Sequence, residues 1–219
     1  AGAISCSGSI EKYSFVGFFP GEGIKGYDGS WHNMSDGLPE NINAEYITED
    51  QDGALYLTTE FSGIFRLEKG AGRWTDISSS VLKRRTQLEG VNEYRQISAF
   101  CIDPADKSKL YLATKHTLYK SADRGKNWQK INVIDNKNSY YFTSLTVVDG
   151  TLYAGTSFNG IVRITPSSTT EINDGIPKEY YVGPFHFCEE VSSVAAYKGM
   201  IYSGYLFGRG MVESSAWKN

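Results

Sequence analysis

Aromatic rings stand beside charged side chains in three segments of the sequence, and this combination is typical of surfaces that bind sugars or peptides. The segments are Ser78–Arg95, Asn132–Phe142 and Asn173–Glu190. Flat rings stack on a ligand while polar groups fix its orientation. In the alternative, the same rings pack against the fold and bind nothing. The residues that we expect to contact a ligand are Tyr94, Arg95, Tyr140, Tyr141, Tyr180, Tyr181 and His186.

Acid–base chemistry has a weaker basis in the sequence. Glutamate precedes tyrosine at Glu45-Tyr46, Glu93-Tyr94 and Glu179-Tyr180. Two carboxylates separated by roughly 5 to 10 Å are what a glycoside hydrolase requires, so a glycan-active hydrolase or lyase is an alternative to simple binding. The sequence contains no G-x-S-x-G, no H-E-x-x-H and no phosphate-cradling glycine loop. No catalytic residue is therefore predicted.

Metal ions and cofactors are not expected either. The three histidines, His32, His116 and His186, lie in different parts of the chain and share no metal-ligand spacing. The three cysteines, Cys6, Cys101 and Cys188, form no C-x-x-C pair, which argues against a zinc site. Three buried thiols remain an option, and so does one disulfide with a free cysteine.

Composition excludes several classes of protein. The 219 residues include 22 Lys+Arg and 25 Asp+Glu, which gives a net charge of −3. Proteins that bind nucleic acid normally have a basic face, so no nucleic-acid partner is expected. With 40% hydrophobic and 14% aromatic residues, the chain is too apolar to be disordered. No run of about 18 apolar residues is present, so no membrane-spanning helix is predicted.

A pattern of strands and turns occurs five times along the chain. The copies begin at Lys12, Ala54, Lys109, Thr151 and Met200. Four of them share a tyrosine in the first strand, namely Tyr56, Tyr111, Tyr153 and Tyr202. Four share a tryptophan that opens the third strand, namely Trp31, Trp74, Trp128 and Trp217, and the fourth copy lacks it. The repeat therefore extends over the whole chain.

One more strand precedes each copy, which gives four strands in a unit of about 44 residues. This period and strand number are typical of β-propeller blades. We therefore predict an all-β fold, a β-propeller with five four-stranded blades, in a single domain over residues 1–219. The approximate blade bounds are 1–40, 41–90, 91–139, 140–185 and 186–219. The blades could close alone, belong to a larger propeller, or complete a ring with another copy. The connections between blades would share one face.

The third copy contains Ser121-Ala122-Asp123-Arg124-Gly125-Lys126-Asn127-Trp128. This segment resembles the Asp-box or BNR repeat of sialidases and sortilin-like receptors, which has the pattern S-x-D-x-G-x-x-W. The resemblance implies a structural role for Ser121, Asp123, Gly125 and Trp128. Sialidases of this type bind a carboxylate with three arginines. Here Arg66 and Arg163 fall at one repeat position, which indicates a role on the blade surface.

A second resemblance concerns Ser35-Asp36-Gly37-Leu38-Pro39 and the segment from Ile47 through Leu55-Tyr56 to Gly63-Ile64-Phe65. These residues resemble the propeller repeat of two-component regulators, and Asn173-Asp174-Gly175-Ile176-Pro177 matches the start of that repeat again. Such propellers form periplasmic sensor regions that bind glycan fragments. The resemblance implies an extracytoplasmic location, either periplasmic, secreted or lipid-anchored. Ala3-Ile4-Ser5-Cys6 loosely resembles a lipoprotein cleavage site.

These observations predict a non-catalytic binding or scaffold protein. Its partner would be a glycan or a protein, recognised through the loops between blades, and self-association is possible in principle. The alternative is a sialidase-like hydrolase or lyase with its site at the mouth of the central channel.

Overall fold

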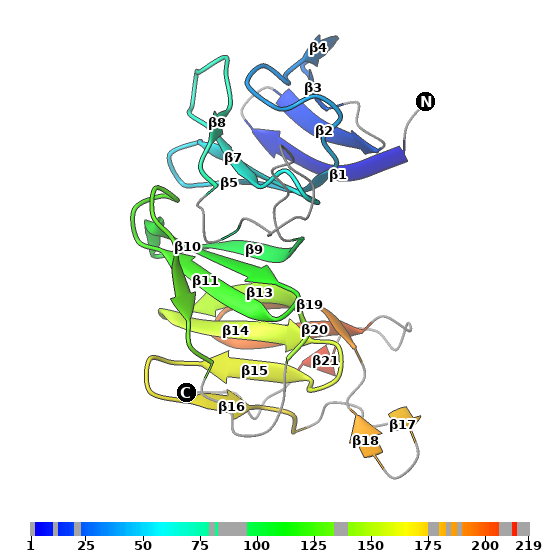
Figure 1. Ribbon diagram of the computed structural model, residues 1–219, viewed down its shortest axis with the longest axis vertical. Coiled ribbons are helices and arrows are strands. Elements are labelled where there is room, and N and C mark those ends of the chain that lie inside the picture. The colour runs from blue at the N-terminus through cyan, green and yellow to red at the C-terminus, as the bar shows by residue number, and fades with distance from the viewer. Residues whose placement is uncertain are drawn as a thin grey trace, which may run out of the picture. The chain divides into compact units, whose positions relative to one another are not determined.

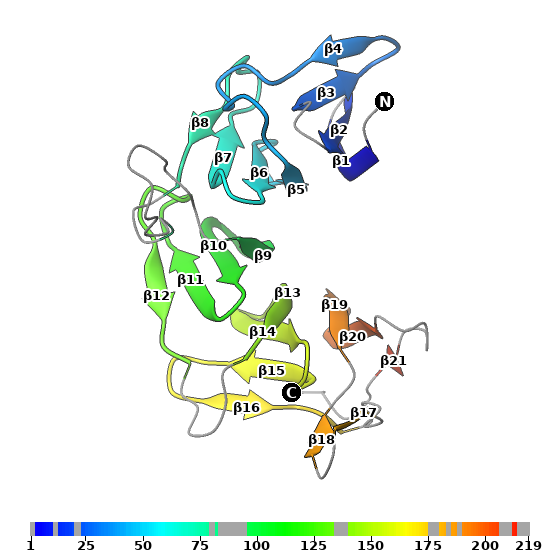
Figure 2. The ribbon, with the colours of Figure 1, turned by 45° about the vertical axis from the view of Figure 1, so that its right-hand side comes forward.

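The chain consists of antiparallel sheets (Figures 1 and 2). The computed structural model describes residues 3–10, 13–19, 23–78, 82, 96–133, 140–174, 180–182, 185–187, 190–205 and 212–213. Within these ranges no α-helix occurs. Contacts divide the chain into two compact units, Ala1–Ile97 with Gly125–Trp128 and Ser98–Arg124 with Gln129–Asn219.

The first unit contains two four-stranded sheets whose strands follow one another in chain order. The first sheet consists of β1 (Ala3–Ile10), β2 (Tyr13–Phe19), β3 (Ile24–Tyr27) and β4 (Trp31–Asn33). The second consists of β5 (Ala44–Glu49), β6 (Leu55–Thr59), β7 (Ile64–Leu67) and β8 (Thr75–Asp76). We refer to these sheets as blades 1 and 2.

The other strands form blades 3, 4 and 5 and a separate hairpin. Blade 3 consists of β9 (Ile97–Asp103), β10 (Asp106–Thr114), β11 (Thr117–Ser121) and β12 (Gln129–Ile131). Blade 4 consists of β13 (Phe142–Val148), β14 (Thr151–Thr156), β15 (Ile161–Ile164) and β16 (Thr169–Glu171). Blade 5 has β19 (Val191–Tyr197), β20 (Met200–Tyr205) and β21 (Val212–Glu213), and the hairpin pairs β17 (Tyr180–Val182) with β18 (Phe185–Phe187).

Tight turns join the first two strands of blades 4 and 5. Asp149 and Gly150 have φ angles of 47° and 73°, and Lys198 and Gly199 have φ angles of 49° and 75°. Two successive positive φ angles are the requirement of a type I′ turn, whose twist matches that of the strands it connects. The turn dipeptides in the sequence therefore fix the register of these hairpins.

In blade 2, burial falls from the middle strands to the outer edge. Every residue of β6 is buried, and its apolar run Leu55-Tyr56-Leu57 explains why, because a strand covered on both faces needs no alternation. All residues of the edge strands β4 and β8 are exposed. In the first unit the core includes Leu55, Leu57 and Trp74, packed with Ile24 and Ile42.

The predicted fold class is confirmed: the chain is all-β, with four-stranded blades in the predicted order. The tyrosine register is also confirmed, because Tyr56, Tyr111 and Tyr153 pair with Arg66, Lys120 and Arg163 at one ladder position. Blade 5 has three strands within the described ranges. The fourth, expected at 216–219 with Trp217, lies outside them. The β17–β18 hairpin was not anticipated within the connection Asn173–Glu190.

Candidate functional site

Two turns and one inter-blade connection of the second unit meet around the ring of Tyr141. The β10–β11 turn supplies Lys115 and His116, and the turn after β14 supplies Phe158. The rings of His116 and Tyr141 meet edge to face with centroids 4.3 Å apart, and those of Tyr141 and Phe158 with centroids 5.7 Å apart. The Lys115 ammonium lies 5.0 Å from the centre of the Tyr141 ring. We call Lys115, His116, Tyr141 and Phe158 the loop-face cluster.

Backbone hydrogen bonds fix this cluster from both sides. The Phe142 amide donates to the Lys115 carbonyl at 3.0 Å, and the Ser157 amide donates to the Tyr141 carbonyl at 2.9 Å. His116 Nδ1 lies 3.2 Å from the Tyr140 carbonyl oxygen. The segment before β13 is thereby bound to the turns on either side of it, so the Tyr141 ring has a defined position.

The adjacent tyrosine has a different environment. The side chain of Tyr140 is only 6% exposed and belongs to the core of the second unit. Its ring lies 5.9 Å from that of Phe142, and its hydroxyl donates to Glu171 Oε1 at 3.4 Å. Tyr140 therefore holds the connection in place, while the half-buried Tyr141 has a surface that a ligand can reach.

The chemistry of the loop-face cluster suits stacking. Lys115 and His116 are exposed, and Phe158 is 43% exposed. An aromatic face beside a cation and a hydrogen-bonding imidazole can hold a sugar ring or a flat peptide group.

Lys115, His116 and Phe158 were not among the ligand-binding residues predicted from the sequence, although one signal for Phe158 was present. The turn Thr156–Gly160 repeats the pattern T-x-F-x-G of Thr59–Gly63. In both turns the threonine Oγ1 donates to the glycine carbonyl at 2.9 Å. The phenylalanine is left exposed in each, and a turn that twice exposes a large ring indicates a contact surface.

The other predicted ligand-binding residues are only partly described. Tyr94 and Arg95 lie outside the described residues. Tyr180 and Tyr181 are on β17 and His186 is on β18, and Tyr181 is paired with His186 across the hairpin. The side chains of this hairpin lie outside the described part of the chain. Of the seven candidates, the structure therefore positions the side chains of Tyr140 and Tyr141.

The segment that resembles an Asp box forms a tight turn. Ser121 Oγ donates to Asp123 Oδ1 at 2.8 Å, and Arg124 and Gly125 have φ angles of 60° and 87°. The positive φ of Gly125 favours glycine there, and a Cβ atom would also lie 2.5 Å from Ile77 Cδ1. Trp128 is 5% exposed. The structural role of these residues and membership of the Asp-box family both stay predictions.

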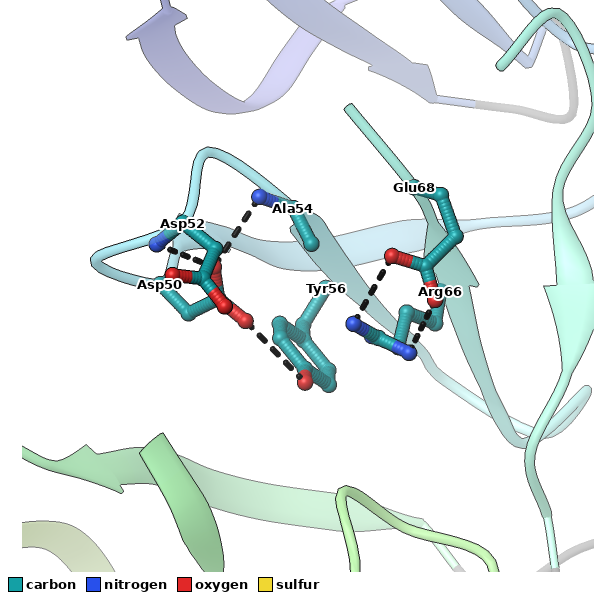
Figure 3. Close-up of polar contacts among 6 residues, drawn as sticks. All are labelled: Asp50, Asp52, Ala54, Tyr56, Arg66 and Glu68. Atoms are coloured by element: carbon teal, nitrogen blue, oxygen red, sulfur yellow. Dashed lines mark hydrogen bonds and ion pairs between the residues drawn. The ribbon is translucent and has the colours of Figure 1, made fainter. Parts of the chain in front are cut away.

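Arg66 also has a structural environment, which Figure 3 shows. Asp50 Oδ1 accepts the amides of Asp52 at 2.9 Å and Ala54 at 3.0 Å, which closes the β5–β6 turn. The Tyr56 hydroxyl donates to Asp50 Oδ2 at 3.4 Å, and the Arg66 guanidinium lies 5.5 Å from the Tyr56 ring. Arg66 also donates to both carboxylate oxygens of Glu68. The guanidinium is therefore engaged within blade 2.

One glutamate has an altered acidity. Burial, and then the neighbouring charge of Glu60, raise the pKa of the Glu45 carboxyl above its usual range. Glu60 in turn accepts a hydrogen bond from Asn43 Nδ2 at 2.9 Å. Burial and then Glu45 raise the pKa of Tyr46. Glu93, Tyr94 and Glu179 lie outside the described residues, so Glu45 is the glutamate of the three pairs whose surroundings are described.

We expect the substitution Glu45→Gln to raise the melting temperature at pH 7 and to leave it unchanged near pH 4. When folding raises the pKa of a carboxyl, the stability that this carboxyl contributes is fully present at pH values below its pKa in the unfolded chain. This contribution is lost as the pH rises through the pKa of the folded state, because the folded state resists ionisation. A neutral amide removes that cost. Melting curves of both proteins across this pH range test the expectation, with the exposed Glu40→Gln as control. An equal gain at both pH values would contradict it.

Cys101 is the cysteine whose side chain the structure describes. Cys101 has a free thiol, and burial followed by the charge of Asp103 raises its pKa to about 12. The side chain of Cys6 and the whole of Cys188 lie outside the described part. Among the residues described, no group of three or more His, Cys, Asp or Glu is arranged to hold a metal ion. No helix in the same ranges is long and apolar enough to span a membrane.

Searches against protein-family models and curated proteins returned no match. Solved structures do resemble the chain. The extracellular domain of the hybrid two-component system BT3049 of B. thetaiotaomicron has a TM-score of 0.66 at 12% identity, covering 100% of this chain and 29% of that one. The extracellular domain of the one-component system BT4673 of the same organism has a TM-score of 0.64 at 15% identity, covering 96% of this chain and 27% of that one.

An ancestral GH74 enzyme has a TM-score of 0.58 at 11% identity, covering 98% of this chain and 31% of that one. The chain thus spans between about a quarter and a third of the length of these three structures. At such low identity the likeness concerns the fold alone. Together with the four-stranded meanders described above, it shows that this chain has the β-propeller fold.

Proposed function

We propose that this chain is a non-catalytic binding or scaffold propeller that recognises a glycan or a protein through the loops between its blades. The observation that supports this proposal is the loop-face cluster. Its central ring, Tyr141, is held by backbone hydrogen bonds on both sides and is flanked by exposed Lys115, His116 and Phe158. A ring whose position is fixed before binding loses little entropy when a ligand stacks on it.

The location and the extent of the site are part of the same proposal. Structural likeness to extracellular domains of bacterial regulators supports an extracytoplasmic location. Tyr94, Arg95, Tyr180, Tyr181 and His186 belong to connections of the same kind and remain proposed contacts. Tyr140 has a positioning role in this scheme. Self-association remains a further possibility to be tested with the purified chain.

A thermal-shift screen against oligosaccharides, sialic acids, peptides and divalent ions is the first test. A ligand that binds only the folded state raises the melting temperature by mass action. We expect a shift with one sugar class or one peptide class. The substitution Tyr141→Ala should then lower the affinity for that ligand by about tenfold or more, as expected for a central aromatic contact.

The matched control is Tyr197→Ala. Tyr197 is also exposed and also has a lysine, Lys198, over its ring at 5.1 Å, but it is the last residue of β19, beside the β19–β20 turn. Loss of this ring should leave the affinity unchanged. If both substitutions weaken binding equally, or if neither does, the loop-face cluster is not the site.

A glycan-active hydrolase or lyase is the second candidate, and the raised pKa of Glu45 beside Glu60 is the observation that favours it. A carboxyl that keeps its proton to higher pH can act as a general acid. Turnover of chromogenic glycosides that disappears in Glu45→Gln would support this candidate. Absence of turnover on a broad panel would leave the binding function.

A further inference from the structure

Two tryptophans of the first unit donate their indole N–H groups to main-chain carbonyls that directly follow an edge strand. Trp74 of blade 2 is 2% exposed and its indole N–H donates to the Met34 carbonyl, just after β4, at 2.7 Å. Trp128, just before β12, is 5% exposed and donates to the Ile77 carbonyl, just after β8, at 3.2 Å. The two contacts repeat one geometry, because Met34 and Ile77 occupy the same place after an edge strand. Their amides also bond alike, to the carbonyls of Ile24 and Ile64.

Blade 4 has a small side chain where this tryptophan belongs. Trp74 is followed by Thr75, which pairs with Arg66. In blade 4 the residue that pairs with Arg163 is Thr170. Arg66 and Arg163 pair with corresponding tyrosines, so Thr75 and Thr170 are counterparts. Trp74 and Thr169 directly precede these two threonines and are therefore counterparts as well. A hydroxyl side chain therefore replaces an indole.

A cavity of about 490 Å³ lies between blades 3 and 4 in this region. Its apolar wall includes Leu152 and Ile164 of blade 4. The ladder pairs of blades 2 and 4 make these residues the counterparts of Leu55 and Leu67, which pack in one cluster with the Trp74 ring. The wall from blade 3 includes Ile131. In blade 2 the Trp74 ring packs with this leucine pair, whereas in blade 4, where Thr169 is the ladder partner of Ile164, the corresponding pair lines a cavity. The cavity volume is in the range of small-molecule sites.

The polar part of the lining is cationic. Lys120 and Lys130 line the cavity together with Gln129, Asn132 and the Tyr111 ring, and the lining residues that the structure describes include no Asp or Glu. An anion would meet two ammonium groups there, and charge-assisted hydrogen bonds are about twice as strong as neutral ones. The apolar wall favours a flat hydrocarbon body.

We propose that the cavity between blades 3 and 4 binds a small aromatic anion, an aryl carboxylate of about the size of an indole. Its ring would occupy the place of the missing tryptophan between Ile131, Leu152 and Ile164. Its carboxylate would contact Lys120 and Lys130. This site is separate from the loop-face cluster. Gly150 and Leu152 of its lining are in the turn before β14 and near the start of that strand, whereas Phe158 follows its end.

The test uses indole-3-acetate and its neutral analogue indole-3-ethanol, each titrated into the full chain by calorimetry or by NMR. We expect saturable binding of indole-3-acetate. The substitution Thr169→Trp should abolish it and raise the melting temperature, because the new indole fills the cavity. The matched control, Thr170→Trp, adds the same side chain at the next, exposed position of the edge strand and should retain binding.

Surface substitutions keep the test decisive if Thr169→Trp fails to fold. The double variant Lys120→Gln, Lys130→Gln should lower the affinity for indole-3-acetate by about tenfold, the equivalent of one lost charged contact. Its affinity for indole-3-ethanol should stay within about twofold of that of the unchanged chain. No saturable binding of indole-3-acetate, unchanged binding in Thr169→Trp, or equal weakening of both probes by the lysine substitutions would overturn the proposal. Tyr141→Ala should not affect indole-3-acetate, which separates this site from the proposed function.

Discussion

Replacing Trp74 by alanine will lower the free energy of unfolding by about 3–5 kcal/mol, the usual range for deleting a fully buried aromatic side chain. The ring packs in one cluster with Leu55, Leu57 and Ile24, so its removal leaves a cavity in the core of the first unit. The Met34 carbonyl also loses its indole partner. Urea unfolding followed by circular dichroism measures the change as a shift of the midpoint.

Trp31→Ala is the matched control, because Trp31 has the same repeat position in blade 1 but is 57% exposed. Its ring lies 5.0 Å from that of Tyr27, also an exposed residue. A surface substitution of this kind changes stability by only about 0.5 kcal/mol. If Trp31→Ala is as destabilising as Trp74→Ala, the blade 1 tryptophan is buried in solution.

Tyr140→Ala will also cost about 3–5 kcal/mol of stability, whereas Tyr141→Ala will cost less than about 1 kcal/mol. The Tyr140 ring packs in the core of the second unit with Phe142. The Tyr141 ring contacts exposed or half-exposed neighbours. Thermal unfolding of the two single variants measures the difference. Stability losses of equal size would show that the two rings are buried alike.

This contrast limits what a double replacement can reveal. Tyr140 and Tyr141 together would combine a core defect with a surface defect, and loss of binding would then have two explanations. Tyr141→Ala alone keeps the hydrogen bonds that its backbone makes, because they use the main chain of Tyr141 and its neighbours. The single variant is therefore the informative one for ligand affinity.

Strands, turns and the blade repeat were determined by the sequence alone, because each depends on short stretches of chain. A continuous apolar run such as Leu55-Tyr56-Leu57 favours a strand that is covered on both faces. Asp149-Gly150 favours a type I′ turn because both residues tolerate positive φ. Such signals lie within one hairpin, and their fivefold repetition predicts a propeller without reference to contacts between blades.

The environment of each side chain was decided by the tertiary structure. Tyr140 and Tyr141 are adjacent and identical in type, yet one is buried and the other half-exposed, since successive residues of an extended segment point in opposite directions. Trp31 and Trp74 match in the repeat, but only Trp74 has an acceptor carbonyl from a preceding blade within the described ranges. The sequence showed that blade 4 lacks its tryptophan. Only the packing of blade 4 on blade 3 shows that the space is left open, because a cavity depends on residues far apart in the chain.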